Sequence, residues 1–351
     1  MSIDFLIVGQ GLAGSLLAWQ LIQRGYRVLV VDEGGENASQ VAAGLINPLS
    51  GQRLVKPPNL EPMLAAALAC YRELEAVFGQ RFYVELPMLR ILRSDRERNY
   101  AEKRLQQPEY ADYLSQPAFD LRVGNNAYGH VTQTCCGYLR TRPLLAELRK
   151  FLIATDSYRQ MPVDYSEIVL EPVLQWRQYK PRHLVFCEGH RASRNPWFSK
   201  LPFQLAKGEI LTCETSSVIP GRILNYGRWL LPLAAGRFKT GATFDTQQLD
   251  DLPTTMACAT LLNDLRPVCR DMENLQVSEH KAGIRPATLD KQPFIGSHPR
   301  HNNLYIFNGF GSKGSLTIPW YGQRFIDRLE QEQSLPSNCN IERYYETYFP
   351  Y

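Results

Sequence analysis

The sequence lacks any apolar run of about 18 residues or more, the length that a membrane-spanning helix requires. Its first residues also lack the basic stretch that opens a secretory signal peptide. The eight cysteines form no C-x-x-C pair, and with only six scattered histidines a structural metal site has little support. We therefore expect a cytoplasmic protein with reduced thiols, no metal and no membrane span.

Strong charge of either sign is also missing, because the formal net charge is only +4. Such a balance neither demands nor excludes an anionic partner. The chain has 351 residues, of which 44% are hydrophobic and 21% charged, as is typical of a soluble globular protein with about two domains. Neither internal repeats nor a low-complexity linker marks a boundary between them.

What the sequence does contain is a glycine-rich turn between two short apolar segments. Residues 3–8 form an apolar run that predicts a strand buried on both faces of a parallel sheet. Residues 12–24 then predict a helix closed by a glycine, and residues 28–31 a second buried strand. The turn reads Gly9-Gln10-Gly11-Leu12-Ala13-Gly14, so the whole unit follows the order of a Rossmann-type dinucleotide site.

Each part of this unit has a physical role. Gly9 permits the tight turn, Gly11 lets the backbone approach a pyrophosphate, and Gly14 lets the helix lie close to the strand. The helix amino end offers unpaired N–H groups to the phosphates. Asp32, about 20 residues further on, can accept hydrogen bonds from a ribose, and Glu33 beside it disfavours a 2′-phosphate. These features predict a bound dinucleotide without separating FAD from NAD.

Helical and strand patterns alternate along the rest of the chain. Residues 60–78 and 141–153 have helical periodicity, whereas residues 82–134 form short alternating segments with charged loops such as 94–104. Residues 205–280 are mostly strand-like. Within them, two segments are predicted to pair as a hairpin across Ala234-Ala235-Gly236.

Two further short apolar segments, residues 183–187 and 304–308, predict buried strands. The second leads into a glycine-rich loop and a helix that ends at about residue 330. Sheet-forming segments thus interrupt an α/β framework twice, so we expect the framework to be discontinuous in sequence. The tyrosine-rich tail, residues 336–351, is expected to pack on the body rather than to mediate self-association.

Other motifs separate FAD from NAD. Residues 39–44 read S-Q-V-A-A-G, and residues 283–296 read G-I-R-P-A-T-L-D-K-Q-P-F-I-G. They resemble the S-x-x-A-A-G stretch and the G-x-R-P-x-T-x-D-x-x-P-x-I-G signature of the D-amino-acid oxidase superfamily, the amine-oxidising flavoproteins that include glycine and sarcosine oxidases. Shorter matches in family order lie at 185–189, 207–209, 229–243 and 308–315.

The resemblance implies an FAD-dependent oxidoreductase that removes a hydride from a carbon bearing an amine, with flavin N5 as acceptor. No cysteine lies between residues 283 and 321, where some relatives attach flavin, so noncovalent FAD is expected. The implied cofactor-binding residues are Gly9, Gly11, Leu12, Ala13, Gly14, Asp32, Glu33, Ser39, Ala43, Gly44, Leu45, Ile46, Val163, Gly189, Phe310, Gly311, Ser312, Lys313, Gly314 and Ser315.

The resemblance also divides the chain. The expected fold class is α/β, and α+β overall, with a Rossmann-type FAD-binding domain that comprises residues 1–81, 136–204 and 283–335. A substrate domain on a mostly antiparallel sheet is expected to comprise residues 82–135 and 205–282.

Three residues are candidates for the substrate side. Arg285 matches the arginine that binds a substrate carboxylate in amino-acid-oxidising relatives, and its guanidinium suits a two-bonded anion clamp. A structural arginine bonded to backbone carbonyls is the alternative. Trp229 falls where relatives place an aromatic residue in the substrate pocket, although core packing explains a tryptophan there equally well. Lys239 lies near the position of a lysine that promotes reaction with oxygen in sarcosine oxidases, but exposed strand lysines are more common.

The expected partners are a small-molecule amine or amino acid and oxygen or another electron acceptor. A second hypothesis is the same chemistry on tRNA. Residues 43–49, 241–245 and 309–314 are also similar to the oxidase half of the bifunctional enzyme that removes a carboxymethyl group from a wobble uridine. A basic stripe across the cleft would favour this hypothesis and a narrow pocket would oppose it. A flavin-binding scaffold without turnover and an NAD-dependent dehydrogenase are further alternatives, which Arg285 and the C-terminal motifs respectively oppose.

Overall fold

The computed structural model describes residues 2–115, 127–234, 236–269 and 272–349. The first of its sheets has six strands, and all neighbours in it are parallel except the pair β17 and β18 at one edge. In spatial order the strands are β17 (Phe294–His298), β18 (His301–Asn308), β11 (Lys180–Phe186), β1 (Ser2–Val8), β2 (Val28–Asp32) and β8 (Tyr158–Gln160). Strands from both ends of the chain meet in this sheet, so its framework is discontinuous in sequence, as predicted.

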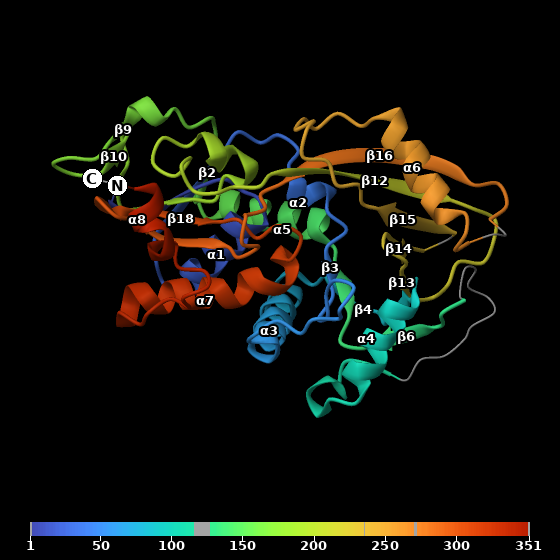
Figure 1. Ribbon diagram of the computed structural model, residues 1–351. Helices are drawn as coiled ribbons and strands as arrows, with labels where there is room; N and C mark the ends of the chain where they lie inside the picture. Colours follow the sequence, from blue (N-terminus) through green and yellow to red (C-terminus); the bar gives the residue numbers. More distant parts are fainter. Residues whose placement is uncertain (1, 116–126, 235, 270–271, 350–351) are drawn as a thin grey trace.

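Both faces of the six-stranded sheet are covered. Along β1, Phe5 and Ile7 face one way, while Leu6 and Val8 face the other, because successive strand side chains alternate. The first face packs against α1 (Leu12–Gln23), α5 (Thr141–Ala154) and α7 (Gly314–Gln331), and α3 (Leu60–Phe78) packs against α7. The second packs against residues 168–176, which include the β9 (Ile168–Val169) and β10 (Gln175–Trp176) ribbon, against residues 192–201 and against the C-terminal segment (Figure 1).

A seven-stranded, mostly antiparallel sheet occupies the other end of the molecule (Figure 1). Its spatial order is β16 (Gln276–Arg285), β12 (Ala206–Glu214), β15 (Arg237–Gly241), β14 (Trp229–Pro232), β13 (Ile223–Asn225), β5 (Met88–Ile91) and β6 (His130–Gln133). β14 and β15 form the predicted hairpin. Helix α6 (Thr255–Leu265) covers one face through Leu261 and Leu265, which leaves the other face toward the Rossmann-type sheet.

A three-stranded sheet joins the two parts. It consists of β3 (Leu45–Ile46), β7 (Gly137–Leu139) and β4 (Tyr83–Glu85), and α2 (Ala38–Val41) precedes it. The expected domain boundary at residues 81/82 separates β4 from its two partners, and the boundary at 282/283 falls inside β16. The predicted division into two domains therefore stays a prediction, although each half of it corresponds to a main sheet.

Two helices differ from the sequence prediction. Residues 94–104 were expected to be a charged loop, but Asp95–Leu105 is helix α4. The Ser94 side chain accepts a hydrogen bond from the Glu97 amide, so it caps the helix start. Few of its residues are buried, so the segment has no apolar periodicity from which a helix could be predicted. Helix α6 was likewise missed within a region predicted as mostly strand.

The C-terminal segment packs on the body, as predicted for the tail. It contains the short helix α8 (Tyr345–Tyr348). The Tyr344 hydroxyl donates to Asp290, and the Tyr345 hydroxyl donates to the Ser297 carbonyl. No helix of the described residues is both long and apolar enough to cross a membrane. All eight cysteines are free thiols.

His298 makes the fold sensitive to acid. Its buried ring lies against Phe198 and Phe349, and its Nδ1 accepts a hydrogen bond from the Arg300 amide. Burial, with help from the neighbouring His301 and Arg300, lowers the pKa of His298 to about 4. Protonation would both charge a buried ring and remove the acceptor. The unfolded chain, in which the histidine pKa is about 6.5, therefore binds more protons between these two values.

We predict that the free energy of unfolding falls by about 2 kcal/mol from this residue as the pH drops from about 7 to 5. Urea unfolding at the two pH values measures the loss. His298→Gln keeps an acceptor but has no titrating group, so its pH dependence should be smaller by that amount. Equal pH dependence in the two proteins would contradict the assignment.

Candidate functional site

A large cavity lies between the carboxyl ends of β1, β2 and β11 and the uncovered face of the seven-stranded sheet. Most of the predicted residues line it. Those residues are Gly9, Gly11, Leu12, Ala13, Asp32, Glu33, Ser39, Ala43, Gly44, Leu45, Val163, Gly189, Trp229, Arg285, Phe310, Gly311, Ser312, Gly314 and Ser315. The predicted residues Gly14, Ile46, Lys239 and Lys313 are not part of the lining.

The glycine turn at the amino end of α1 is packed too closely to hold side chains. Gly9 has a φ of +104°, and a Cβ there would come within 2.5 Å of the Cys187 carbonyl oxygen. A Cβ on Gly14 would overlap the Gly9 carbonyl. Gly14 therefore affects the cavity indirectly. It lets α1 lie against β1, as predicted, and this contact places the helix amino end in the lining.

Asp32 and Ser39 brace this turn. The Asp32 carboxylate accepts hydrogen bonds from the Gln10 amide at 2.8 Å and from the Gly34 amide at 2.7 Å. The Ser39 hydroxyl accepts one from the Leu12 amide at 3.0 Å. Because a carboxylate has about four acceptor positions, Asp32 retains capacity for a ribose hydroxyl. Its ribose role stays a prediction, while its contact with the turn is observed.

Two helix amino ends meet at the cavity. α1 starts after Gly11 and α7 after Lys313; neither of these two residues caps its helix with its side chain, and neither helix has an acidic residue in its first turn. Gly314 and Ser315, the first residues of α7, line the same cavity as the α1 turn, although they lie near the other end of the sequence. Apart from the Leu12 amide, which is bonded to Ser39, the N–H groups of these first turns and the positive end of the helix dipole favour negative charge at both places. A pyrophosphate and an electron-rich reduced flavin are groups that gain from such ends.

Several lining residues were not predicted. Arg191 forms an ion pair with Glu33, and this contact lowers the pKa of the Glu33 carboxyl. Glu188 accepts hydrogen bonds from the Tyr165 hydroxyl at 2.8 Å and from the Asn195 amide at 2.9 Å. Burial nevertheless raises the pKa of Glu188 to about 7. The sequence signal for Glu188 was its place between a buried strand and a glycine, but nothing in that pattern specified its partners.

Arg285 enters the cavity wall from the end of β16. Its Nη1 donates to the Thr243 carbonyl at 3.2 Å and to the Lys207 carbonyl at 3.5 Å. Burial lowers the pKa of the guanidinium, and the nearby Arg228 cation acts in the same direction. Among the described residues no carboxylate pairs with Arg285, so its charge faces the cavity unneutralised. The Arg285 guanidinium is thus bonded to backbone carbonyls, as the structural alternative expects, and it is also open to an anion, as a carboxylate clamp requires.

Trp229 stands on the same wall. It pairs with Gly241 across the β14–β15 hairpin, and a Cβ on Gly241 would lie 3.0 Å from the indole Cζ2. The half-buried indole therefore lies over this glycine and gives the cavity an apolar side. This placement is compatible both with core packing and with a role of Trp229 in the substrate pocket.

Two lysines do not reach the cavity lining. Lys239 lies on the same sheet face as Trp229 but two positions along β15 from Gly241, and burial lowers its pKa. The Lys313 Nζ donates to the Ser50 hydroxyl at 3.2 Å. Their expected roles beside a flavin stay predictions. Ile46 is buried in the core cluster under the cavity instead of lining it.

The residues present fit a flavin dinucleotide. Glycines leave room for close approach, two helix amino ends favour anionic groups, and Phe310, Ala43 and Leu45 supply apolar surface for a ring system. Among the described residues no group of three or more His, Cys, Asp or Glu side chains has a metal-binding arrangement.

Comparison with known proteins agrees with this fit. The family model for FAD dependent oxidoreductases (DAO) matches residues 4–328. The glycine oxidase of Pseudomonas putida is 23% identical over 94% of this chain and 95% of its own length. The tRNA 5-methylaminomethyl-2-thiouridine biosynthesis bifunctional protein MnmC of Acinetobacter baylyi is 24% identical over 96% of this chain. The chain spans 54% of that relative's length.

Among solved structures, the glycine oxidase from Geobacillus kaustophilus superposes with a TM-score of 0.83. The alignment covers 95% of this chain and 96% of that one, at 21% sequence identity. At this level of identity the likeness shows a shared fold, so the expected fold class is confirmed.

The contact at Gly14 yields a prediction. Gly14→Ala adds a methyl group that overlaps a backbone carbonyl, so α1 must move away from β1. We expect a loss of about 1–3 kcal/mol in the free energy of unfolding and a clear fall in FAD retained on purification. Flavin released by acid and urea unfolding measure the two effects.

Gly221→Ala is the matched control. A Cβ there meets nothing within 4 Å, and its φ lies outside the left-handed region. It should retain both FAD and stability. Normal FAD content in Gly14→Ala would contradict the close-packing argument.

Proposed function

The chain belongs to the DAO family of FAD dependent oxidoreductases, and we propose that it oxidises a C–N bond of a small amine or amino acid that carries a carboxylate. The observation that supports this substrate class is the unneutralised Arg285 guanidinium in the cavity wall. A carboxylate would accept hydrogen bonds from it and cancel its charge at the same time. The glycine oxidase relatives are consistent with a substrate of this kind.

The chain's own residues would bind and orient. When bound, FAD supplies the two-electron acceptor that turns a carbon–nitrogen single bond into an imine. The α1 turn and the α7 start would hold its charged and electron-rich groups, while Trp229 closes an apolar side of the cavity. Arg285, fixed by Thr243, would set the distance between the substrate carboxylate and the reacting carbon.

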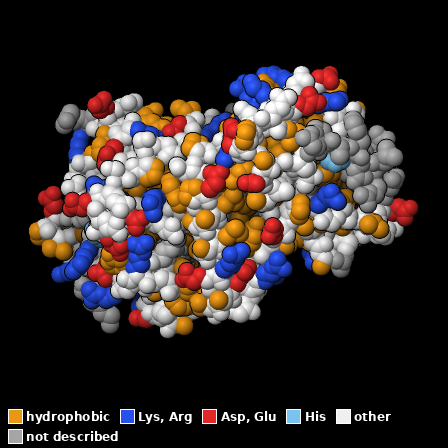
Figure 2. Space-filling view, turned by 90° about the horizontal axis from the view of Figure 1, so that it is seen from below, with side chains coloured by type: hydrophobic (Ala, Val, Ile, Leu, Met, Phe, Trp, Pro, Cys, Tyr) orange, Lys and Arg blue, Asp and Glu red, His pale blue; other side chains and the backbone are white. Residues whose placement is uncertain are grey.

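A modified tRNA base is not separated from a free amino acid by Arg285 alone, because both can present a carboxylate next to an amine. Two basic residues near the cavity rim, Arg142 and Lys281, pair with Glu36, which is itself part of the lining. On the face shown in Figure 2, Lys and Arg side chains lie in separate groups among acidic ones, and hydrophobic side chains gather in the middle. The basic stripe that would favour tRNA is not seen on this face, so the tRNA partner stays a prediction.

The decisive experiment is anaerobic reduction of the bound flavin. Purified holoprotein is mixed with amines, D- and L-amino acids, N-methylated amino acids and tRNA, and bleaching of the flavin absorbance is followed. We expect bleaching by at least one carboxylate-bearing amine and much slower bleaching by its amide. Bleaching only by tRNA would favour the second hypothesis, and bleaching by none of them would favour a scaffold. Reoxidation with and without oxygen then identifies the class of electron acceptor.

The role of Arg285 is tested by Arg285→Ala. Loss of a hydrogen bond to a charged group costs about 1.5–3 kcal/mol, so KM for the carboxylate substrate should rise roughly 10- to 100-fold. FAD content should hold, because Arg285 lies on the sheet opposite the nucleotide turn. Arg177→Gln, at a surface ion pair with Glu167, is the control. Unchanged KM in Arg285→Ala would rule out the anion clamp.

A further inference from the structure

Strand β12 separates two environments at residues 207–209. Lys207 and Glu209 point to one face of the sheet, and Gly208 between them lines the cavity on the other. The segment 242–254, which connects β15 to α6 and is called the strap below, crosses the Lys207 face. Arg285 lies at the other edge of β12, paired with Ala206.

Because Gly208 has no side chain, it leaves a path for the Arg285 side chain along the cavity side of β12. A Cβ at position 208 would overlap the guanidinium of Arg285 at Nη1, Nη2 and Cζ. The guanidinium thus lies directly over the Gly208 backbone on the cavity side. Any side chain there would displace the end of the arginine side chain, because that end is the part free to move.

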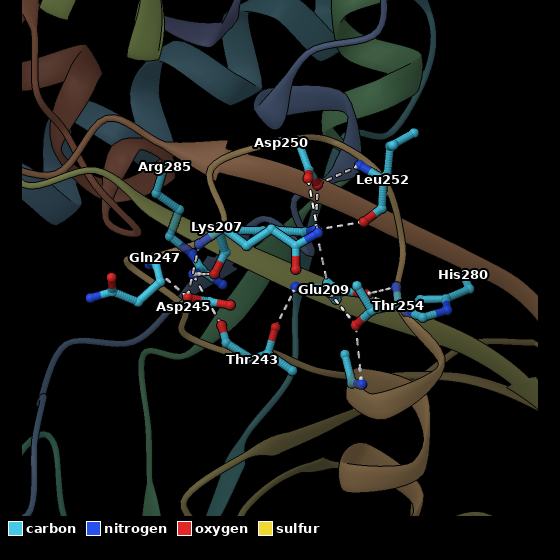
Figure 3. Close-up of polar contacts among 12 residues, drawn as sticks. Lys207, Glu209, Thr243, Asp245, Gln247, Asp250, Leu252, Thr254, His280 and Arg285 are labelled. Carbon is cyan, nitrogen blue, oxygen red and sulfur yellow. Dashed lines mark hydrogen bonds and ion pairs between the residues drawn. The ribbon is translucent and has the colours of Figure 1, made fainter.

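Lys207 holds the strap from the opposite face. Its side chain is only 1% exposed, which is rare for a lysine and requires full pairing. Its Nζ lies 2.5 Å from both the Asp250 carboxylate and the Leu252 carbonyl, and 3.7 Å from Glu209 (Figure 3). Its backbone exchanges two hydrogen bonds with Asp245, at 2.7 and 3.0 Å.

Glu209 secures the two ends of the strap. Its carboxylate accepts from the Thr254 amide at 2.7 Å and from the Thr254 hydroxyl at 3.0 Å. The His280 Nε2 lies 2.8 Å from the same carboxylate. At the other end, the Thr243 hydroxyl accepts from the Glu209 amide. Thr243 is also the residue whose carbonyl accepts from Arg285 (Figure 3).

We propose that Lys207 is a positioning residue for the substrate carboxylate: its ion pair with Asp250 fixes the strap, so that the Thr243 carbonyl and the open surface of Gly208 hold the Arg285 guanidinium in one orientation at the cavity wall. This inference rests on the proposed role of Arg285. Without the ion pair, the strap keeps its ends and its backbone pairing at Asp245 but loses the side-chain anchor at Asp250 and Leu252. The guanidinium then samples more orientations, and a carboxylate must order it on binding.

Lys207→Met tests the proposal. Methionine has a similar length and no charge, and Asp250 is 38% exposed, so the unpaired acid can be hydrated. Asp250→Asn removes the same ion pair from its exposed side, while the Leu252 carbonyl and Glu209 remain beside the buried Lys207 Nζ. Glu214→Gln is the matched control, since it breaks an ion pair with Arg237 at the far end of β12.

Two quantities are measured on each holoprotein. The first is the dissociation constant of acetate, a carboxylate that is not oxidised, from the change in flavin absorbance. The second is the ratio of kcat/KM for a carboxylate-bearing amine to that for its amide. In Lys207→Met we expect acetate to bind roughly tenfold more weakly, about one hydrogen bond to a charged group, and the ratio to fall by a similar factor. Asp250→Asn should change both in the same direction, and the control should change neither.

The outcomes separate three cases. If both variants bind acetate as the wild type does, or lose activity toward the carboxylate and the amide equally, the positioning role is overturned while the function stands. If the wild type shows no preference for the carboxylate over the amide, the proposed function fails and this inference fails with it. Gly208→Ala should weaken acetate binding at least as much as Lys207→Met, and unchanged binding would overturn the path assigned to Arg285.

Discussion

The contact between helix α1 and strand β1 is closer than any side chain would permit, and the cofactor site depends on it. Gly14 lies against the Gly9 carbonyl, and Gly9 lies against the Cys187 carbonyl at the end of β11. Three backbone segments are thereby brought to one point. The amino end of α1 faces the cavity only because no Cβ separates these segments, and Asp32 then holds the turn by its amide hydrogen bonds.

A glycine also permits close packing where the second sheet meets the cavity. On β12, one glycine lies between a buried lysine and a buried glutamate. Because strand side chains alternate, the two charged residues can organise the strap on one face while the glycine admits the arginine on the other. The short segment 207–209 therefore couples a charged network remote from the cofactor to the one cation in the cavity wall that lacks an acidic partner among the described residues.

Much of the fold was accessible from the sequence because it is encoded locally. The glycine turn, the buried strands and the long helix that ends at Gly79 each have their signal within a few residues. Helix α4 was missed because its residues are mostly charged and its surface mostly exposed, so only the Ser94 cap marked it. Local patterns of this kind carry no information about which segments share a sheet, and the resemblance to a family supplied that part.

The sequence also predicted those parts of the candidate site that are encoded locally. Gly9 and Gly11 line the cavity because their positions follow from the turn itself. Lys313 lies between two lining residues in sequence and still falls outside the lining, because the direction of a long side chain depends on packing from distant segments. Arg191 and Glu188 could not have been paired with Glu33 and Tyr165 in advance, since each pair joins separate elements only in the folded state.

Arg285 shows why an incomplete electrostatic environment is itself informative. Desolvation makes a buried cation costly unless it is paired, and backbone carbonyls offset only part of that cost. Arg228 nearby adds repulsion, although its own ion pair with Asp264 reduces its effect. An anion entering the cavity would relieve both penalties in a medium where charge–charge attraction is stronger than in water. The cavity wall is therefore built to gain more from a carboxylate than from a neutral group of the same shape.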